Sequence, residues 1–349
     1  MNANLNFEIK AIATAVPSKI FHCSSLYEDF GKKEIDAIIQ TTGVSRVRIV
    51  GEHTTAADLC FAAAQELLTT LSLDKSTIDG LVFVSQTRDY ILPQTSHVLQ
   101  SRLGLNETTF CIDIPLGCSG YVHGILQAAL LLNSTSCENI LVLAGDTTSK
   151  MINPKDKSVR MLFGDAGSAT LVTRSDLTGY FEVRSDGSGA NKLIMPAGGY
   201  REPSNFETSI TREAEDGNMR SENDIYMDGM AIFEFMIKRV PQLVESMLAT
   251  LNWKKDELDL LALHQPNMFV LNYLRKRLKL EPEKVPIVVE GFGNTGPCSL
   301  PLIFSEKGNN LNKTSRLQKV IMAGFGVGLS WAGFSCNLSN TTFIQPKEI

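Results

Sequence analysis

Cys118 is the residue of this sequence best placed to act as a nucleophile. It lies in IDIPLGCSGYVHGILQAALLL, where an apolar strand segment passes through LGCSG into a long apolar helix. Glycines on both sides permit a tight strand-to-helix turn and leave the thiol unshielded. A helix N-terminus offers unpaired N–H groups and a positive dipole end, so we expect the thiolate to be favoured. The same window also fits a small residue packed in a crowded turn.

A histidine and an asparagine are the candidate partners of this thiol. His123 lies five positions after Cys118 in the expected helix, which turns it roughly 140° away. His264 ends the apolar strand LDLLALH and opens QPNMF, at a strand end where α/β sites are built, although a histidine with only a structural role is the alternative. Asn294 lies in EGFGNTGPCSLP, and the glycine-rich turn at 323–331 could offer N–H groups to an oxyanion.

Alternating strands and helices are expected to position these residues. Apolar runs at 81–84 and 140–144 flank a helical stretch at 120–133, which predicts α/β layers with buried sheets. The chain also repeats itself: IDGLVFV, GCSG and VLAG recur in the same order as LDLLALH, GNTG and IMAG. We therefore predict two duplicated α/β halves, residues 1–178 and 179–349, whose packing brings the three candidate residues into one pocket.

Composition excludes several classes of protein. The chain has 349 residues, of which 43% are hydrophobic and 20% charged, as in a fully folded protein with a large core. Its net charge of −5 gives no reason to expect nucleic acid as a partner. No run approaches the ~20 apolar residues of a membrane span, and no leader pattern opens the chain, so we expect a cytoplasmic protein. Seven scattered cysteines without a C-x-x-C pair predict neither a metal site nor disulfides.

A long polar, glycine-containing stretch follows the predicted boundary between the halves. It runs from about Ser185 to Asp228 and includes the acidic segment TREAEDGN. A connection of this length inside a compact fold is often a functional loop or lid, and an ordinary surface excursion is the alternative.

The blocks GCSG, LHQPN, GNTG and GFGVG match, in order and spacing, the active-site blocks of β-ketoacyl-acyl-carrier-protein synthase III. The sequence resembles this family through nearly its whole length, including TTGVSRVRI, FGDAGSATLV and YMDGMAIFEF. The resemblance implies a thiolase-like fold with buried mixed sheets in αβαβα layers. It also implies that Cys118 is the acylated nucleophile, that His264 and Asn294 assist decarboxylation, and that the N–H groups of Cys118 and Gly328 form the oxyanion hole.

The activity implied by this resemblance is a decarboxylative Claisen condensation. An acyl thioester, from acyl-CoA or an acyl-carrier protein, would load the cysteine, and a malonyl thioester on acyl-carrier protein would extend it. The resemblance also implies a homodimer without metal or redox cofactor. Acyl transfer or thioester hydrolysis without condensation, and a non-catalytic binding role, are the alternatives.

Two differences from relatives on the same fold disfavour the chemistry of those relatives, and a third difference bears on the substrate. The C-terminal glycine loop, MAGFGVG, lacks the second cysteine of biosynthetic thiolases, and Gln86 stands where hydroxymethylglutaryl-CoA synthases have a glutamate. Housekeeping synthases hold the adenine of coenzyme A between a Trp and an Arg, and those places here hold Ala37 and Thr41. We therefore expect a carrier-bound donor or a longer acyl group, and acetyl-CoA as a poor primer.

The segment MFVLNYLRKRLKL after His264 predicts an amphipathic helix. Phe269, Tyr273 and Leu274 are expected on one side, and cations gather in the final turns at Arg275, Lys276, Arg277 and Lys279. Cations also suit the negative end of a helix dipole, so an ordinary solvated terminus is the alternative. Because acyl-carrier proteins are strongly acidic, the resemblance makes Lys276 and Arg277 candidate docking residues.

Overall fold

The computed structural model describes residues 1–314 and 316–349, and in this part of the chain ten strands form one hydrogen-bonded mixed sheet. Its order is β12-β13-β14-β7-β6-β4-β5, with β1 beside β7. The strands of this path are β4 (Gly80–Val84), β5 (Phe110–Ile114), β6 (Asn139–Asp146), β7 (Ala166–Ser185), β12 (Leu260–Leu263), β13 (Val320–Gly326) and β14 (Ser330–Cys336). The short C-terminal strands β15 (Thr342–Phe343) and β16 (Lys347–Glu348) pair with β1 (Asn2–Val16).

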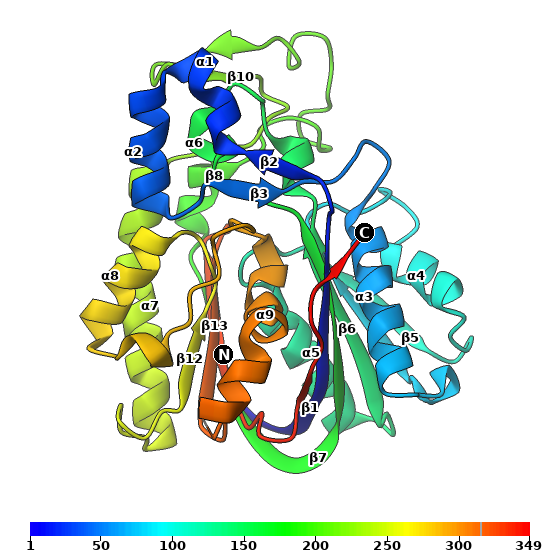
Figure 1. The fold of residues 1–349 in the computed structure, drawn as a ribbon. Helices are drawn as coiled ribbons and strands as arrows, with labels where there is room; N and C mark the ends of the chain where they lie inside the picture. Colours follow the sequence, from blue (N-terminus) through cyan, green and yellow to red (C-terminus); the bar gives the residue numbers. More distant parts are fainter. Residues whose placement is uncertain (315) are drawn as a thin grey trace.

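The two long strands β1 and β7 run through the whole sheet network and connect its two parts. The first part of β7 pairs with β6 over 166–173, whereas its last part pairs with β14 over 181–185. Strand β1 follows β7 antiparallel, with register shifts after Asn6 and after Ile9. The network therefore divides into two sheet layers that face each other across α5 and α9 (Figure 1).

The same pairing pattern occurs in both layers. Strand β4 runs parallel to β6, which is antiparallel to β7, and β7 is antiparallel to β1. In the other layer β12 runs parallel to β13, which is antiparallel to β14, and β14 is antiparallel to the end of β7. This recurrence supports our proposal of two duplicated halves. The proposed division after residue 178 falls within β7, the strand shared by both layers.

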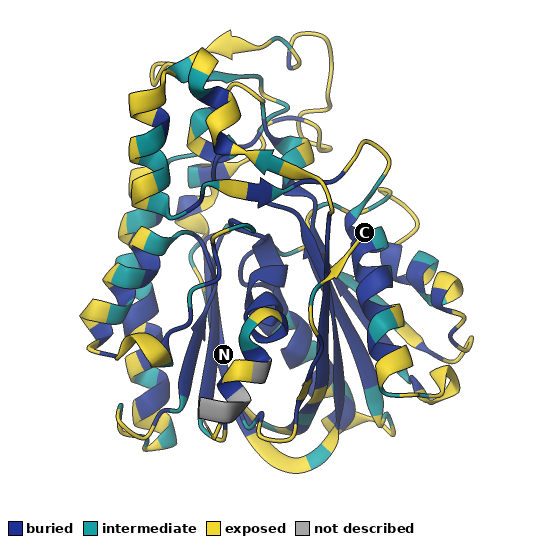
Figure 2. Ribbon diagram, in the orientation of Figure 1, coloured by how far each residue is buried: buried dark blue, intermediate teal, exposed yellow. Residues whose placement is uncertain are grey.

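Helices form three layers around the two sheet layers. Helices α5 (Gly120–Ser134) and α9 (Ser299–Thr314) lie between them, α3 (Ala56–Thr70) and α4 (Thr95–Leu103) cover one outer face, and α7 (Gly229–Leu251) and α8 (Met268–Leu278) cover the other (Figure 1). Each helix layer has its own apolar cluster. Residues of α5 contact both sheets, which explains why this helix is apolar nearly all round (Figure 2). Each large side chain buried there contributes about 1.5–3 kcal/mol.

A region of short strands, helices and loops covers one end of the layers, above the ends of β6, β12 and β13 (Figure 1). Its N-terminal elements are β2 (Ile20–His22), η1 (Cys23–Leu26), α1 (Tyr27–Phe30), α2 (Lys32–Thr42) and β3 (Arg46–Arg48). Its other elements include α6 (Lys157–Arg160), η4 (Gly187–Lys192), β8 (Leu193–Ile194), β9 (Arg212–Glu213), β10 (Met219–Arg220) and β11 (Tyr226–Met227). The polar stretch 185–228 thus forms part of this cover. Among the described residues, no helix is both long and apolar enough to cross a membrane.

Candidate active site

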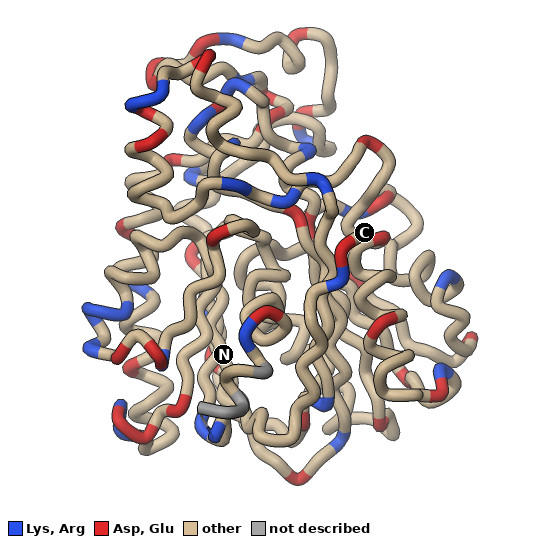
Figure 3. Tube along the Cα trace, in the orientation of Figure 1, with Lys and Arg blue, Asp and Glu red and all other residues tan. Residues whose placement is uncertain are grey.

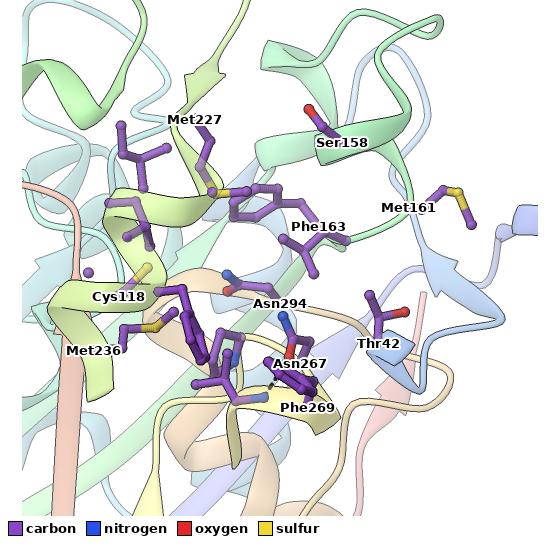
Figure 4. A pocket seen from close by; sticks show the side chains of 18 of the residues that line it. Thr42, Cys118, Ser158, Met161, Phe163, Met227, Met236, Asn267, Phe269 and Asn294 are labelled. Carbon is purple, nitrogen blue, oxygen red and sulfur yellow. Dashed lines mark hydrogen bonds between the residues drawn. The ribbon is translucent and has the colours of Figure 1, made fainter. Parts of the chain in front are cut away.

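Cys118, His264 and Asn294 line one cavity of about 440 Å³. Cys118 precedes α5, His264 follows β12, and Asn294 lies shortly before η6 (Gly296–Cys298). His264 directly follows β12, Cys118 follows β5 by four residues, and Asn294 forms an isolated β-bridge with Phe163, so three different segments bring these residues to one cavity. Figure 4 shows Cys118 and Asn294 among the apolar side chains of this cavity. The structure therefore brings together the three residues that the repeat predicts to share a pocket.

Cys118 is held in a close-packed turn and is 7% exposed. A Cβ added at Gly326, the last residue of β13, would lie 2.8 Å from the Cys118 Sγ, so this position must be glycine for the strand to pass the thiol. Burial, assisted by the negative charge of Asp146, raises the pKa of the Cys118 thiol to about 12. The expectation of a favoured thiolate is therefore wrong for the resting enzyme, since burial outweighs the N–H groups at the turn.

Two backbone N–H groups oppose this rise in the pKa of Cys118, its own and that of Val327. Both therefore stabilise negative charge at the thiol, as an oxyanion hole must do for the adjacent carbonyl oxygen. Our sequence-based prediction placed the second donor at Gly328, one residue further along. We propose Val327 in its place. The sequence gives little indication of which amide is the donor, because any residue type can supply a main-chain N–H. The choice depends on where β13 ends, at Gly326, since Val327 is the next residue.

His264 is a buried, neutral imidazole. Its side chain is 1% exposed, and burial lowers its pKa to about 3 despite an opposing contribution from the Gly296 backbone. The Nδ1 atom forms a 2.7 Å hydrogen bond with the Ser299 hydroxyl, which leaves Nε2 for the cavity. When the Ser299 hydroxyl donates to Nδ1, Nε2 carries the proton and can donate it to a ligand. The neighbouring Phe325 ring lies nearly perpendicular to the imidazole, with centroids 5.4 Å apart, and further fixes its orientation.

Asn294 is held by both its main chain and its side chain. The backbone N–H donates to the Leu162 carbonyl at 2.8 Å, and the side-chain Oδ1 accepts from the Gly296 N–H at 3.0 Å. Because the carbonyl end of the amide is occupied in this way, the Nδ2 donor is left for the cavity that Asn294 lines. A neutral imidazole and a carboxamide can thus present two N–H groups to one ligand atom.

The rest of the cavity is mostly apolar. Its lining residues Met230 and Phe269 are exposed, which places the mouth at α7 and α8, beside α2. Apolar or sulfur-containing side chains form much of the wall, among them Met161, Leu162, Phe163, Leu193, Met227, Ile232, Met236 and Phe325 (Figure 4). Ile38 and Thr42 of α2 reach the cavity, whereas Ala37 and Thr41 are exposed beside them. The Thr41 hydroxyl donates to the Ala37 carbonyl at 2.9 Å. Neither side chain offers a planar group to an adenine ring.

Helix α8 connects this mouth to the predicted docking residues. Phe269 lines the cavity and Tyr273 lies one turn further, both half-exposed and packed against Phe233 of α7 with ring centroids 5.4 and 5.6 Å apart. Leu274 is buried, so its expected place beside the two aromatic rings is wrong. Lys276 and Arg277 are exposed in the last turn, roughly 10 Å along the helix from Phe269 (Figure 3).

Comparison with known proteins agrees with the architecture and with the motifs. Residues 112–187 match the family model described as 3-oxoacyl-[acyl-carrier-protein (ACP)] synthase III, and residues 248–338 match the model of its C-terminal part. A putative 3-oxoacyl-[acyl-carrier-protein] synthase 3 from Campylobacter jejuni is 32% identical, over 95% of this chain and 94% of the relative. The crystal structure of a 3-oxoacyl-(acyl-carrier protein) synthase from Burkholderia xenovorans LB400 superposes with a TM-score of 0.91 and 35% identity, over 100% of this chain and 99% of that one.

The chain belongs to the 3-oxoacyl-[acyl-carrier-protein] synthase III family. A β-ketoacyl-[acyl-carrier-protein] synthase III from Caldanaerobacter subterraneus, 32% identical over 84% of this chain and 87% of its own length, supports the same assignment. The predicted α/β thiolase-like fold is confirmed, and as a synthase III the protein is an acyltransferase of the condensing type.

Proposed function

We propose that this synthase loads an acyl group on Cys118 and condenses it with a malonyl group carried by acyl-carrier protein. The observation that carries the proposal is the meeting of a thiol, a neutral imidazole and a carboxamide in one largely apolar cavity. A thiol can hold an acyl group as a thioester without losing its activation. Two N–H donors opposite it can stabilise the enolate that decarboxylation of a malonyl thioester produces.

In the first half-reaction, the Cys118 sulfur attacks the thioester carbonyl of the acyl donor. Negative charge develops on the carbonyl oxygen, and the N–H groups of Cys118 and Val327 stabilise it. The C–S bond to the donor then breaks, and the thiol proton passes to the departing thiolate. The products are an acyl thioester on Cys118 and a free donor thiol, in an exchange that is close to thermoneutral.

In the second half-reaction, the malonyl thioester enters through the same mouth. Its C–C bond to the carboxylate breaks, CO₂ leaves, and the electron pair forms an enolate whose oxygen accepts hydrogen bonds from His264 Nε2 and Asn294 Nδ2. Each donor is worth about 2–4 kcal/mol in the transition state. The enolate carbon then attacks the acyl carbonyl on Cys118, the C–S bond breaks, and the cysteine takes up a proton to become a thiol again.

The donor of the acyl group is carrier-bound in this proposal. Ala37 and Thr41 leave the mouth without planar groups for adenine, whereas Lys276 and Arg277 offer an acidic carrier protein two exposed cations. We further propose a cytoplasmic homodimer. The consecutive residues Tyr90, Ile91 and Leu92 are 58%, 65% and 78% exposed, and an apolar segment of this kind is typical of a surface covered in an assembly.

The proposal is tested by a reaction with acyl-carrier protein loaded with radiolabelled malonyl groups and a second carrier loaded with an acyl group. We expect CO₂ and a β-ketoacyl-carrier product in equal amounts, with the thioester carbon and the methylene carbon of the malonyl group retained in the product. A free carboxylic acid as the main product would assign a thioesterase instead. Acyl exchange between carriers without CO₂ release would assign a transferase that does not condense.

A further inference from the structure

A second cavity reaches Cys118 from another side. Its volume is about 210 Å³, and it shares the walls formed by Cys118, Phe163 and Leu193 with the larger cavity. It does not include His264 or Asn294 among its lining residues. An acyl group attached to Cys118 therefore has a space of its own, separate from the place where the malonyl group meets its two N–H donors.

The wall of this second cavity combines apolar side chains with three polar ones. The apolar residues are Met151, Phe163, Leu193, Ile194, Met195, Ile225 and Val327. The polar residues are Gln86, Asp146 and Thr148. The side chain of Gln86 bends towards the nucleophile, since its Oε1 would lie 2.1 Å from a Cβ added at Gly117, the residue before Cys118.

Asp146 is the most buried of these polar residues, at 2% exposure, and its two oxygens differ. Oδ1 accepts from the Ser85 hydroxyl at 2.9 Å, from the Gln86 N–H at 2.7 Å, and from the N–H and hydroxyl of Thr87 at 3.2 Å each. Oδ2 has no hydrogen-bond partner within residues 1–314 and 316–349, and it lies on the side of Gly296, another residue of the cavity wall.

The other two polar side chains are also without partners. In the described part of the chain, neither the hydroxyl of Thr148, a residue only 5% exposed, nor the carboxamide of the exposed Gln86 forms a hydrogen bond. Two buried polar groups, Asp146 Oδ2 and the Thr148 hydroxyl, thus face one small cavity without a protein partner in the described chain, and the exposed Gln86 lies beside them. A buried polar group costs free energy unless it is paired, and a carboxylate costs more than a neutral group. Asp146 Oδ1 has a structural role, because its hydrogen bonds hold residues 85–87 in place. This role does not involve Oδ2.

We propose that the acyl group of this enzyme carries a hydrogen-bond donor, a hydroxyl or an ammonium, that binds Asp146 Oδ2 in the second cavity. The inference rests on the proposed function and specifies its substrate class. The donor satisfies the carboxylate, and the Thr148 hydroxyl or the Gln86 amide can hold the same substituent, while the apolar residues pack the carbon chain. Burial raises the pKa of Asp146 to about 6, so the carboxylate is mainly ionised at neutral pH and accepts hydrogen bonds.

Such a site selects by rejecting acyl groups that leave the carboxylate unpaired. A site built to hydrogen-bond a substrate substituent discriminates strongly against the analogue that lacks it. An unsubstituted alkyl chain would place methylene groups against Asp146, and the desolvated carboxylate would then have neither water nor a donor. We therefore expect the substituted acyl group to be loaded at least about tenfold faster.

The test uses carrier-bound acyl thioesters of equal length: unsubstituted, with a hydroxyl on the third, fourth or fifth carbon, and with an ammonium at the same places. Loading of Cys118 is followed by intact mass spectrometry, and kcat/KM is compared within each length. At least one donor-bearing acyl group should exceed its unsubstituted counterpart about tenfold, and the position and charge of the best substrate identify the donor. Equal or faster loading of the unsubstituted group in every pair would overturn the inference.

Two variants distinguish the proposed role of Asp146 in substrate binding from its role in holding residues 85–87. Asp146→Asn keeps the size of the side chain and should abolish the preference, whereas Ser85→Ala removes a hydrogen bond from Oδ1 only and should keep it. If Asp146→Asn does not fold, the comparison of substrates on the wild-type enzyme still decides. Absence of acylation by any thioester would contradict the proposed function itself. Loading of unsubstituted groups alone would contradict only the role of Asp146.

Discussion

At the scale of residues, the site works with neutral groups rather than with a preformed ion pair. Burial keeps the Cys118 thiol protonated and the His264 imidazole uncharged at neutral pH. A neutral imidazole retains the N–H that it donates to an enolate, and a neutral thiol costs less free energy in an apolar cavity than a thiolate. The arrangement suits a reaction whose negative charge appears only in the transition states.

The low pKa of His264 makes a prediction about pH. The imidazole should remain neutral down to about pH 3, so decarboxylation by the enzyme already acylated on Cys118 should show no inflection near pH 6.5. Between about pH 6.5 and pH 3, His264 binds a proton in the unfolded chain but not in the folded protein. Acidification through this range should therefore lower the free energy of unfolding. Single-turnover CO₂ release between pH 5.5 and 8 checks the first point. A loss of rate with an apparent pKa of 6 to 7 that also occurs in Asp146→Asn, which lacks the other nearby group with a pKa of about 6, would show that His264 titrates normally.

The two proposed N–H donors, His264 and Asn294, should show non-additive effects when both are removed. His264→Ala and Asn294→Ala should each retain self-acylation but lose about 30- to 1,000-fold in decarboxylation, which corresponds to ~2–4 kcal/mol. The double variant should be scarcely worse than either single variant, because both donors serve one oxygen. Release of labelled CO₂ measures the effect, with the exposed His97→Ala as control. Unchanged release in either active-site variant would remove that residue from the mechanism.

At the scale of elements, the close approach of β13 to the turn before α5 sets the space around the thiol. Gly326→Ala would place a methyl group 2.7 Å from the Cys118 Cβ and 2.8 Å from its Sγ, so the thiol or the strand must move. We expect acylation to fall at least about a hundredfold, as a displaced nucleophile predicts. Gly187→Ala, where nothing lies within 4 Å of the added Cβ, is the matched control. Normal acylation of the Gly326 variant would contradict this packing.

Helix α8 predicts how the carrier protein is recognised. Reversing charge in Lys276→Glu with Arg277→Glu should raise KM for malonyl-carrier protein at least about tenfold, with little change for a small malonyl thioester. The wild-type KM should rise with salt, because exposed charges are screened beyond roughly 10 Å. Lys75→Glu, an exposed site in the other half, serves as control. Equal losses for both substrates would show that the end of α8 is only a solvated terminus.

The elements predicted from the sequence are those with strong local patterns. The apolar runs at 81–84 and 140–144 are β4 and β6, and the helix expected at 120–133 is α5. The features that were missed depend on contacts between distant segments. The proposed Val327 donor depends on where β13 ends beside the thiol, Leu274 is buried by tertiary packing, and burial decides the charge of Cys118. The local periodicity of the sequence does not indicate any of these three features.

At the scale of the whole molecule, the site lies where the proposed halves meet. Cys118 comes from one half, His264 and Asn294 come from the other, and the cover formed by 185–228 contributes Leu193 to both cavities. In the proposed mechanism each half supplies a different function, the nucleophile or the pair of N–H donors. The proposed duplication would therefore create a site that neither half contains alone.

In the proposed mechanism, Cys118 carries the acyl group between the two half-reactions. Intact mass spectrometry after incubation with acetyl-CoA and a panel of acyl-carrier donors tests it most directly, followed by mapping of the modified peptide. We predict one acyl increment on the Cys118 peptide, slower labelling by acetyl-CoA than by the best carrier donor, and no increment in Cys118→Ala. A covalent adduct on another residue, or an adduct that persists in the alanine variant, would contradict the claim.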